Sequence, residues 1–401
     1  MSDTYNDLPF DGVKVLDLSQ GIAGPYCGMH LARNGADVIK VEPPGAGCWS
    51  RLLGKHTGDQ TAHSVIVNRA KRSLAVDLKT AEGVTIVQKL AAGCDVLIQN
   101  YRVGKIDQFK LDYASVQKTN PDIIYLSISG FGATGPLADQ PATDSVMQAY
   151  TGMMAINRDV NGAPQRIEML AIDFATGLYT FQAVAAALYR KAMKGRGAHI
   201  ESSLLECALA LQEGAMMEHH LQGGAAEPIG MPVGMFKTKD GYMSVNARRD
   251  EHFKRLCTLL GKEDWITDPR YADARARVLN RVQLLADLRP HFETRTSNEW
   301  VELLSGIDIL KAKVNTYDDL FDDPQVQTVN AIRWVENDTL GRVPMGHLCG
   351  QQPLETGDRL AHAPHVGEHT RQILGEIGYA GAEIDKLGAA GVVGCYPSAV
   401  A

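Results

Sequence analysis

The sequence predicts an α/β protein with a parallel, doubly wound sheet and a second, smaller domain. In the first half of the chain, short strand-like runs alternate with segments of helical length, which is typical of strands connected by crossover helices. Near residue 225, prolines and glycines precede a hairpin pattern, so the alternation of strands and helices ends there. The 401 residues are also too many for one ordinary domain.

Six runs of strand-like composition predict the large sheet. They lie at residues 13–18, 36–42, 74–78, 95–99, 123–129 and 199–205. Pro25 suits the first turn of a helix that ends before Gly35, and Thr80 suits the N-cap of a helix that ends before Gly93. Residues 173–194 are apolar on nearly all faces, so we expect this helix to be buried.

The second domain is expected at residues 225–325. Strand patterns at 235–238 and 242–246 flank Asp240-Gly241, which is a strong hairpin signal, and helical stretches fill most of 250–312. Residues 362–401 are expected to form a helical tail.

The composition excludes several classes of function. A net charge of −7 leaves no broad basic field for nucleic acid. The sequence has no run of about 18 uninterrupted apolar residues that would predict a membrane span. Residues 1–9 lack the apolar core of a signal peptide, so we expect a cytoplasmic protein. The seven cysteines include no Cys-x-x-Cys motif, and we expect free thiols.

Three histidines near the C-terminus have the spacing of one helix face. His362, His365 and His369 would suit a metal ion, but Pro364 disturbs the first interval and Glu368 is the one carboxylate at a fitting position. We therefore predict no metal site.

The turn at residues 21–24 joins a strand to a helix, where dinucleotide-binding proteins carry G-x-G-x-x-G. Ala23 and Tyr26 occupy the second and third glycine positions, so the fingerprint fails and a nicotinamide-dependent dehydrogenase is disfavoured. Two interpretations of this turn remain, an anion site at a helix N-terminus and a plain tight turn.

Arg69, Lys71, Arg72 and Lys79 form the densest positive cluster in the first half of the chain. A solvated surface is the more common role of such a cluster, and we favour it. The place of the cluster beside a predicted parallel strand makes a phosphate clamp the alternative.

Asp173 stands at the entry of the long apolar helix. One interpretation is an N-cap, a role that Asp serves well. The other is a catalytic carboxylate that the helix dipole keeps ionised, because an aspartate can act as a covalent nucleophile without a partner base. The two roles are compatible, since a capping carboxylate can still present one oxygen to a ligand.

Several segments, in the same order along the chain, resemble the family III CoA-transferases. This family includes the formyl-CoA:oxalate and carnitine CoA-transferases and the related α-methylacyl-CoA racemases. The matching segments are residues 11–19, 23–25, 34–45, 71–79, 95–102, 129–136, 173–206 and 363–370. Together they span nearly the whole chain.

The resemblance implies a Rossmann-like large domain at 1–224, a small α+β domain at 225–325 and a C-terminal segment, 326–401, that returns to the large domain. It also implies a homodimer of interlocked chains. The implied activity is transfer of CoA from an acyl-CoA donor to a carboxylic acid, through mixed-anhydride and aspartyl-CoA thioester intermediates. The CoA thioester is then a substrate, and no cofactor is needed.

The resemblance assigns site residues by position. Asp173 matches the nucleophilic aspartate of the family. Asp144 and a loop that contains Gly230 and Gly234 are candidates for the acyl and acceptor side. The candidate CoA-binding residues are Ile22, Ala23, Val76, Lys79, Asn100 and Tyr101.

Three positions depart from patterns of the family. Pro43 and Gln108 stand where some members have arginine, which weakens the expected phosphate contacts. Thr143 stands where the racemases need a histidine, and two-base racemisation is hard to run without this acid/base partner. An acyl-CoA racemase or isomerase is therefore the alternative function, and a non-catalytic CoA-binding module is a further one.

Four arginines bear on the choice of acids. Arg158, Arg166, Arg248 and Arg249 are candidates to pair with a second carboxylate of a substrate. On that basis we favour a dicarboxylate acceptor, with succinyl-CoA as the first donor to test.

Overall fold

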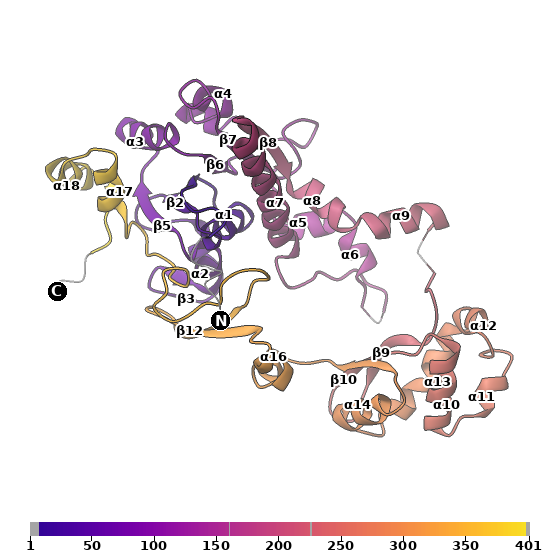
Figure 1. The fold of residues 1–401 in the computed structure, drawn as a ribbon. Coiled ribbons are helices and arrows are strands. Elements are labelled where there is room, and N and C mark those ends of the chain that lie inside the picture. Colours follow the sequence, from indigo (N-terminus) through magenta and orange to yellow (C-terminus); the bar gives the residue numbers. More distant parts are fainter. Residues whose placement is uncertain (1–7, 160, 225–226, 398–401) are drawn as a thin grey trace. The chain divides into compact units, whose positions relative to one another are not determined.

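The computed structural model describes residues 8–159, 161–224 and 227–397. The chain forms two compact units (Figure 1). Unit 1 comprises Met1–Glu213 and Asn330–Ala401, and unit 2 comprises Gly214–Val329. The sequence analysis placed the corresponding boundaries at 224/225 and 325/326.

Among the described residues, the large sheet of unit 1 has seven strands in the order β14-β5-β2-β1-β6-β7-β8. The parallel strands are β1 (Lys14–Asp17), β2 (Asp37–Glu42), β5 (Arg72–Val76), β6 (Val96–Gln99), β7 (Ile124–Ser129) and β8 (Ala198–Ser203). Each predicted run overlaps one of them, so the parallel sheet is confirmed. The sequence analysis missed β14 (Val393–Gly394), which pairs antiparallel with β5.

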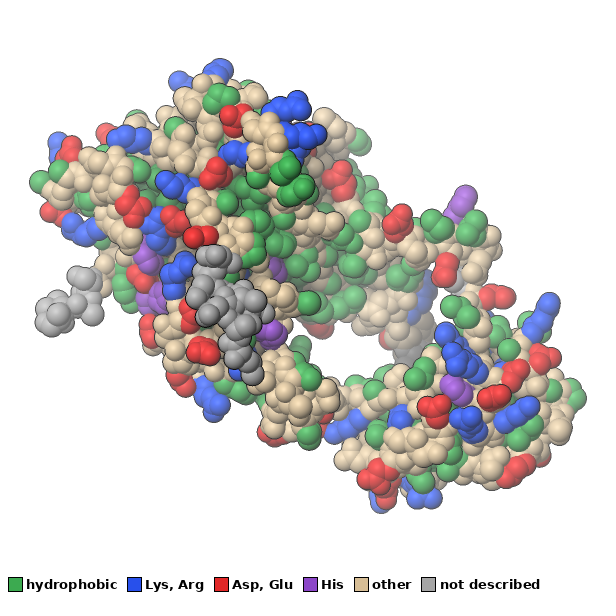
Figure 2. Space-filling view, viewed as in Figure 1, with side chains coloured by type: hydrophobic (Ala, Val, Ile, Leu, Met, Phe, Trp, Pro, Cys, Tyr) green, Lys and Arg blue, Asp and Glu red, His purple; other side chains and the backbone are tan. Residues whose placement is uncertain are grey.

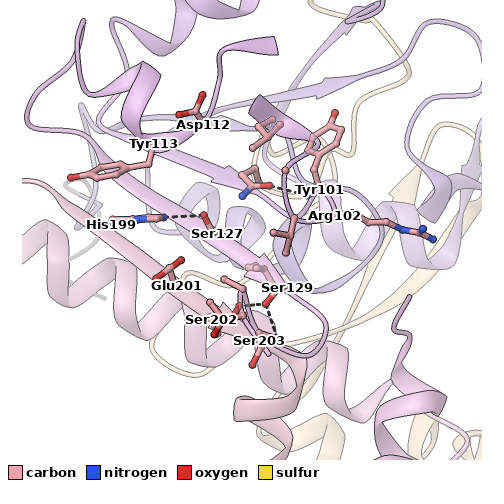
Figure 3. A pocket seen from close by; sticks show the side chains of 18 of the residues that line it. Tyr101, Arg102, Asp112, Tyr113, Ser127, Ser129, His199, Glu201, Ser202 and Ser203 are labelled. Atoms are coloured by element: carbon pink, nitrogen blue, oxygen red, sulfur yellow. Dashed lines mark hydrogen bonds between the residues drawn. The ribbon is translucent and has the colours of Figure 1, made fainter. Parts of the chain in front are cut away.

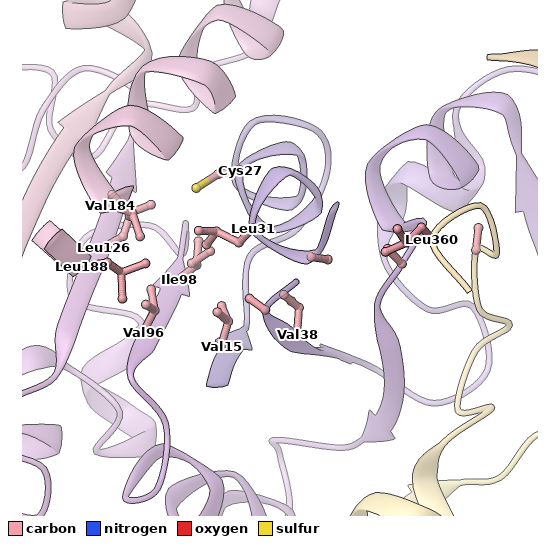
Figure 4. Packing of buried hydrophobic residues seen from close by; sticks show 14 of the residues in the cluster. Val15, Cys27, Leu31, Val38, Val96, Ile98, Leu126, Val184, Leu188 and Leu360 are labelled. Carbon is pink, nitrogen blue, oxygen red and sulfur yellow. The ribbon is translucent and has the colours of Figure 1, made fainter. Parts of the chain in front are cut away.

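Helices cover one face of this sheet through an apolar cluster. Leu31 of α1 (Ala23–Arg33) and Val184 of α7 (Ala171–Lys194) belong to the same group of buried side chains as Val96 of β6 (Figure 4). A short loop connects the carboxyl end of β1 to the first turn of α1, and this edge is where a parallel sheet places ligands.

A second cluster covers the opposite face. Ile86 of α3 (Ala81–Ala91) and Ile373 of α17 (Thr370–Glu376) group with Leu97, the neighbour of Val96 on the same strand. Successive strand residues point to opposite faces, so helices on both sides make the sheet doubly wound. Thr80 caps α3 as predicted, since its side chain accepts from the Gly83 N–H at 3.1 Å.

Helix α7 is less buried than the sequence analysis expected. Within the described residues, it is the one helix with the length and mean hydropathy (1.3) of a membrane span. It packs on α1 and on α8 (Leu204–Leu211), and 39% of its most apolar window is buried. A long core helix meets the same criteria of length and composition. Burial in the core does not explain the apolar residues that α7 exposes.

The predicted helical tail, residues 362–401, contains α17, α18 (Gly381–Ala389) and the short strand β14. Before it, the chain forms a hairpin of β12 (Ile332–Asn337) and β13 (Gly341–Gly346). The sequence analysis did not predict the hairpin. The short strand β14 completes the sheet at its β5 edge, so the two ends of unit 1 share one core.

In its described residues, unit 2 has a three-stranded antiparallel sheet in the order β11-β10-β9. Its strands are β9 (Val233–Lys237), β10 (Tyr242–Asn246) and β11 (Leu310–Lys313). The predicted hairpin at Asp240-Gly241 joins β9 to β10. The helices are α9 (Glu213–Gln222), α10 (Asp250–Leu260), α11 (Asp264–Thr267), α12 (Ala274–Leu279), α13 (Arg281–Phe292), α14 (Ser297–Ser305), α15 (Tyr317–Phe321) and α16 (Pro324–Thr328).

Candidate active site

A cavity of about 290 Å³ lies at the carboxyl edge of the large sheet. The loops that follow β1, β6 and β7 form its walls, and the first turn of α7 reaches into it. Its lining includes Ile22, Ala23, Asn100, Tyr101, Thr143 and Asp173. The structure thus brings together the predicted nucleophile and four of the six predicted CoA-binding residues.

Asn100 joins two of the cavity walls. Its side-chain oxygen accepts from the Gln20 N–H at 2.7 Å, and its amide nitrogen donates to the Gln20 carbonyl at 2.7 Å. These paired hydrogen bonds fix the loop after β6 to the loop after β1. Residues on rigidly connected loops hold a ligand without further ordering.

Gly21 is required by the packing of the same wall. Its φ is +83°, and a Cβ atom at this position would lie 1.9 Å from the Trp49 ring. Trp49 begins a short helix, η1 (Trp49–Leu52), and lines the cavity. The glycine turn therefore allows an aromatic ring to approach the backbone closely. The sequence analysis did not single out Trp49, although an aromatic residue in a loop after a strand is a common pocket signal.

Asp173 is the third residue of α7 and does not cap it. The N-cap position is Leu170, which supplies no side-chain hydrogen bond. The Asp144 carboxylate takes the capping role, because its Oδ2 accepts from the Ile172 N–H at 2.7 Å and from the Asp173 N–H at 3.2 Å. The N-cap interpretation of Asp173 is therefore wrong, and its side chain is left to line the cavity.

The ionisation of Asp173 also differs from the expectation. Burial and the nearby negative charge of Asp144 raise the pKa of Asp173 to about 7. We expected the helix dipole to keep this carboxylate ionised at neutral pH. The helix N–H groups that would do so are bonded to Asp144 instead, so at pH 7 Asp173 is divided between its acid and its carboxylate.

A larger cavity of about 630 Å³ adjoins the first one and shares Tyr101, Arg102 and Ser129 with it (Figure 3). Along its floor, His199 bonds to Ser127 at 3.1 Å. Four carboxylates line this cavity, from Asp107, Asp112, Glu201 and Glu206. Among the described residues lining either cavity, Arg102 is the one Lys or Arg. This second cavity therefore disfavours phosphate groups.

The remaining predicted site residues lie elsewhere. Val76 is buried at the end of β5 and pairs with β14, and Lys79 is exposed in the following turn. Strand β2 separates β5 from β1, and neither residue lines the two cavities. Asp144 is buried and does not line them either. Gly230 and Gly234 belong to unit 2, in which Gly234 is part of β9.

The basic cluster does not form one surface: Lys79 is exposed, whereas the other three residues are buried or paired with carboxylates. Arg69 and Lys71 are buried, so the predicted exposed surface is wrong for them. The Lys71 Nζ lies 2.8 Å from Asp17 Oδ2 in the core. Arg72 pairs with Asp37 and Glu376. Burial next to Arg33 lowers the pKa of Arg69 to about 10.

The C-terminal histidines pair with carboxylates rather than with one another. His362 lies 2.8 Å from Glu368, and His365 lies 2.7 Å from Asp59. The described part of the chain holds no group of three or more His, Cys, Asp or Glu side chains suited to a metal ion. All seven cysteines are free.

Arg158 and Arg166, the candidate arginines of unit 1, do not line either cavity. Arg158 donates to the carbonyls of Ala155 and Gly162, and Arg166 pairs with Glu168. The other two, Arg248 and Arg249, belong to unit 2. Arg102 is a cation that the sequence analysis missed, although it directly follows two predicted site residues.

The fold and site together define a mixed α/β enzyme with a carboxylate at the carboxyl edge of a parallel sheet. The family model for CoA-transferase family III matches residues 10–370, and the chain belongs to this family. The resemblance found in the sequence is thereby confirmed. The chain is a CoA-transferase.

Several known proteins are similar along most of the chain. The human succinyl-CoA:glutarate CoA-transferase is 35% identical, and the match covers 98% of this chain and 91% of the human protein. The acetyl-CoA:oxalate CoA-transferase of Acetobacter aceti is 35% identical over 74% of this chain and 78% of its own length. A crystal structure of a CAIB/BAIF family protein from Brucella suis has a TM-score of 0.83 at 32% identity, covering 92% of this chain and all of that chain.

Proposed function

We propose that this chain moves CoA from an acyl-CoA donor to a carboxylic acid, with Asp173 as the covalent nucleophile. The observation that carries the proposal is the place of the Asp173 carboxylate. It lines the cavity between the loops after β1 and β6, and no described residue donates a hydrogen bond or forms an ion pair with its side chain. A carboxylate in such surroundings is poorly solvated and free to attack a bound carbonyl group.

The reaction balances without a proton or a cofactor. The Asp173 carboxylate attacks the thioester carbonyl, which forms an acyl-aspartyl anhydride and releases CoA thiolate. The thiolate attacks the aspartyl carbonyl, which gives an aspartyl-CoA thioester and the donor acid as its carboxylate. The acceptor carboxylate attacks this thioester and forms a second anhydride. The released thiolate then attacks the acceptor carbonyl, which yields the new CoA thioester and regenerates Asp173.

The CoA contacts follow from the same geometry. The thiol end would lie against Ile22 and Ala23, beside Asn100 and Tyr101, because these residues line the cavity with Asp173. The carboxylates of the larger cavity would repel the phosphates of CoA. We therefore place the phosphates on the other side of β1, towards Val76 and Lys79, where the exposed Lys79 ammonium supplies a positive charge.

For the acids, we propose a dicarboxylate acceptor such as glutarate and succinyl-CoA as the donor. The relatives named for these substrates support this choice. Arg102 is exposed and borders both cavities, so its guanidinium is the cation best placed to pair with a second substrate carboxylate. Gly230 and Gly234 remain proposed as the loop that covers the acyl group.

We also propose an interlocked homodimer. Helix α7 exposes Leu178, Tyr179, Tyr189 and Met193, and α8 exposes Leu211. Figure 2 shows hydrophobic side chains gathered over this part of unit 1. Exposed apolar patches of this kind mark protein interfaces. A partner chain would bury the part of α7 that a single chain leaves in contact with water.

The test is a transfer assay with separated CoA thioesters. Succinyl-CoA and glutarate are incubated with native protein and with Asp173→Asn, and glutaryl-CoA is measured by chromatography. Native turnover and its loss in the variant support the proposal. Solvent deuterium at the α-carbon of a branched acyl-CoA, without transfer to any acid, would instead indicate a racemase, against which Thr143 argues.

A further inference from the structure

The Asp144 carboxylate connects the first turn of α7 to the helix α5 (Asp144–Tyr150). Its Oδ2 accepts from the backbone N–H groups of Ile172 and Asp173, at 2.7 and 3.2 Å. Its Oδ1 accepts from the Gln148 Nε2 at 2.6 Å. The side chain is 3% exposed. A carboxylate anion that is buried needs hydrogen-bond donors, and Asp144 has three of them.

Gln148 is held so firmly that it fixes the orientation of Asp144. It is fully buried, and its Oε1 accepts from the Ile167 N–H at 2.9 Å. Its Nε2 donates to the Ile167 carbonyl at 3.1 Å as well as to Asp144. Because Ile167 offers both an N–H and a carbonyl, the two ends of the amide cannot exchange without losing these bonds. The segment that leads into α7 is thus tied to α5.

Few other titratable groups face this turn. From α1, the Tyr26 ring packs on Phe174 at a centroid distance of 4.8 Å. From α8 comes Cys207, whose thiol is 3.5 Å from the Ser202 hydroxyl, and from the loop after β6 come Tyr101 and Arg102, which line the same cavity as Asp173. None of them forms an ion pair with Asp173 among the described residues. The charge that acts on Asp173 therefore comes from Asp144.

We propose that Asp144, locked by Gln148, is a positioning residue that fixes the first turn of α7 and keeps a negative charge beside the Asp173 nucleophile. This inference rests on the proposed function of Asp173. It gives Asp144 a role different from contact with the acceptor acid, because its carboxylate is buried and bonded away from both cavities. Gln148 acts through Asp144 and not on the substrate.

The neighbouring charge has a chemical consequence. Asp144 repels the free Asp173 carboxylate, but it does not repel Asp173 as a neutral anhydride or thioester. The charge therefore lowers the cost of forming the covalent intermediates relative to the free nucleophile. The raised pKa of Asp173 reports the same repulsion, together with burial.

The experiment is the pH dependence of the half-reaction. Acyl-CoA is mixed with excess protein between pH 5 and pH 9. This range extends about two units either side of the pH at which we expect half of the maximal labelling, because Asp173 loses its reactive carboxylate form as it is protonated. Covalent intermediate on Asp173 is quantified by mass after hydroxylamine capture. The variants are Asp144→Asn and the double variant Asp144→Asn/Gln148→Glu. In the double variant, the new amide can donate to the new carboxylate in place of the original bond, and the negative charge moves one side chain away from Asp173.

We expect native protein to show a midpoint near pH 7, and Asp144→Asn to shift it down by about one unit or more. In the double variant, the oxygen that replaces Nε2 faces the Ile167 carbonyl, so we expect its thermal stability to stay below that of native protein and its midpoint to stay below the native one as well. Asp273→Asn is the matched control, because Asp273 caps α12 in unit 2 by accepting from the Ala276 N–H at 2.8 Å. Its midpoint should be unchanged.

The failures are distinguishable. If native protein forms no covalent intermediate with any donor, the proposed function fails and the inference falls with it. If native protein is labelled but Asp144→Asn keeps the native midpoint, only the role of Asp144 is overturned. Loss of the fold in both variants would give Asp144 a purely structural role and would overturn it as well.

Discussion

The Asp144 carboxylate accepts a hydrogen bond from the backbone N–H of Asp173 at 3.2 Å, so one aspartate caps the helix that presents another. The capping carboxylate is bonded to the protein, whereas the Asp173 side chain lines a cavity. Two carboxylates of the same chemical type thus have different tasks because their surroundings differ.

Replacing Asp173 should stabilise the protein at alkaline pH. The folded pKa of about 7 lies above the ordinary value of 3.8, so ionising this half-buried group opposes folding. The destabilisation is fully present above pH 7 and disappears as the pH falls towards 3.8. We expect Asp173→Asn to gain about 1 to 3 kcal/mol in the free energy of unfolding at pH 8. Urea denaturation at pH 8 and pH 4 checks this. A gain that is equal at both pH values would contradict it.

Gly21→Ala should disrupt the cavity wall. A methyl group there would meet the Trp49 ring at 1.9 Å and would also force a positive φ on alanine. Gly54→Ala is the control, because its φ is +80° and no atom lies within 4 Å of the new Cβ. Both variants carry the backbone strain, so the excess loss of transfer activity in Gly21→Ala measures the ring contact. We expect this excess to be at least about tenfold. Equal losses would refute the packing argument.

Asn100→Ala should weaken CoA binding. The change removes two hydrogen bonds to Gln20 that hold the cavity walls together. At about 1 kcal/mol for each bond, we expect the dissociation constant for CoA to rise about tenfold or more, as measured by calorimetry. Asn120→Ala is the control, since its amide also donates to two carbonyls, of Ala91 and Cys94, away from both cavities. A similar change in both variants would show a general effect on the fold.

Lys71→Met should cost much more stability than the loss of an exposed ion pair. Lys71 and Asp17 are fully buried, and Lys40 lies 3.7 Å from the other carboxylate oxygen, so removing the Lys71 ammonium takes away one of the two cations that compensate Asp17, at a cost of about 2 to 4 kcal/mol. Arg371→Gln breaks a pair with Asp385 that is 58% and 63% exposed, and it should cost less than about 1 kcal/mol. Thermal melts compare the two variants. A Lys71→Met melt close to that of native protein would contradict the account.

Local patterns in the sequence were sufficient for the large sheet. Strands β1, β6 and β7 are short apolar runs, which local sequence shows. The ends of α3 depend on Thr80 and Gly93, which lie close to the helix in the sequence. The same local reasoning identified Asp173 at a helix start, and the resemblance gave it a role. The two-residue strand β14 was missed because its pairing with β5, far away in the chain, defines it.

The electrostatics of the site depend on contacts between distant residues. Asp144 and Asp173 are 29 positions apart, and nothing in either neighbourhood shows that one caps the helix of the other. Lys71 has a sequence context typical of a surface cation, yet its partner Asp17 lies 54 positions away on a buried strand. Arg102 was overlooked for the opposite reason, since its role depends on the shape of two adjoining cavities.

The central claim is that Asp173 carries the covalent intermediates, and intact-protein mass tests it most directly. Native protein and Asp173→Ala are incubated with succinyl-CoA, then with hydroxylamine, and the modified residue is located by peptide mapping. Capture of an activated aspartyl group as its hydroxamate predicts a gain of about 15 Da on Asp173 in native protein. The Asp173→Ala protein should show no gain. A gain that persists in Asp173→Ala, or one that maps to another residue, would contradict the account.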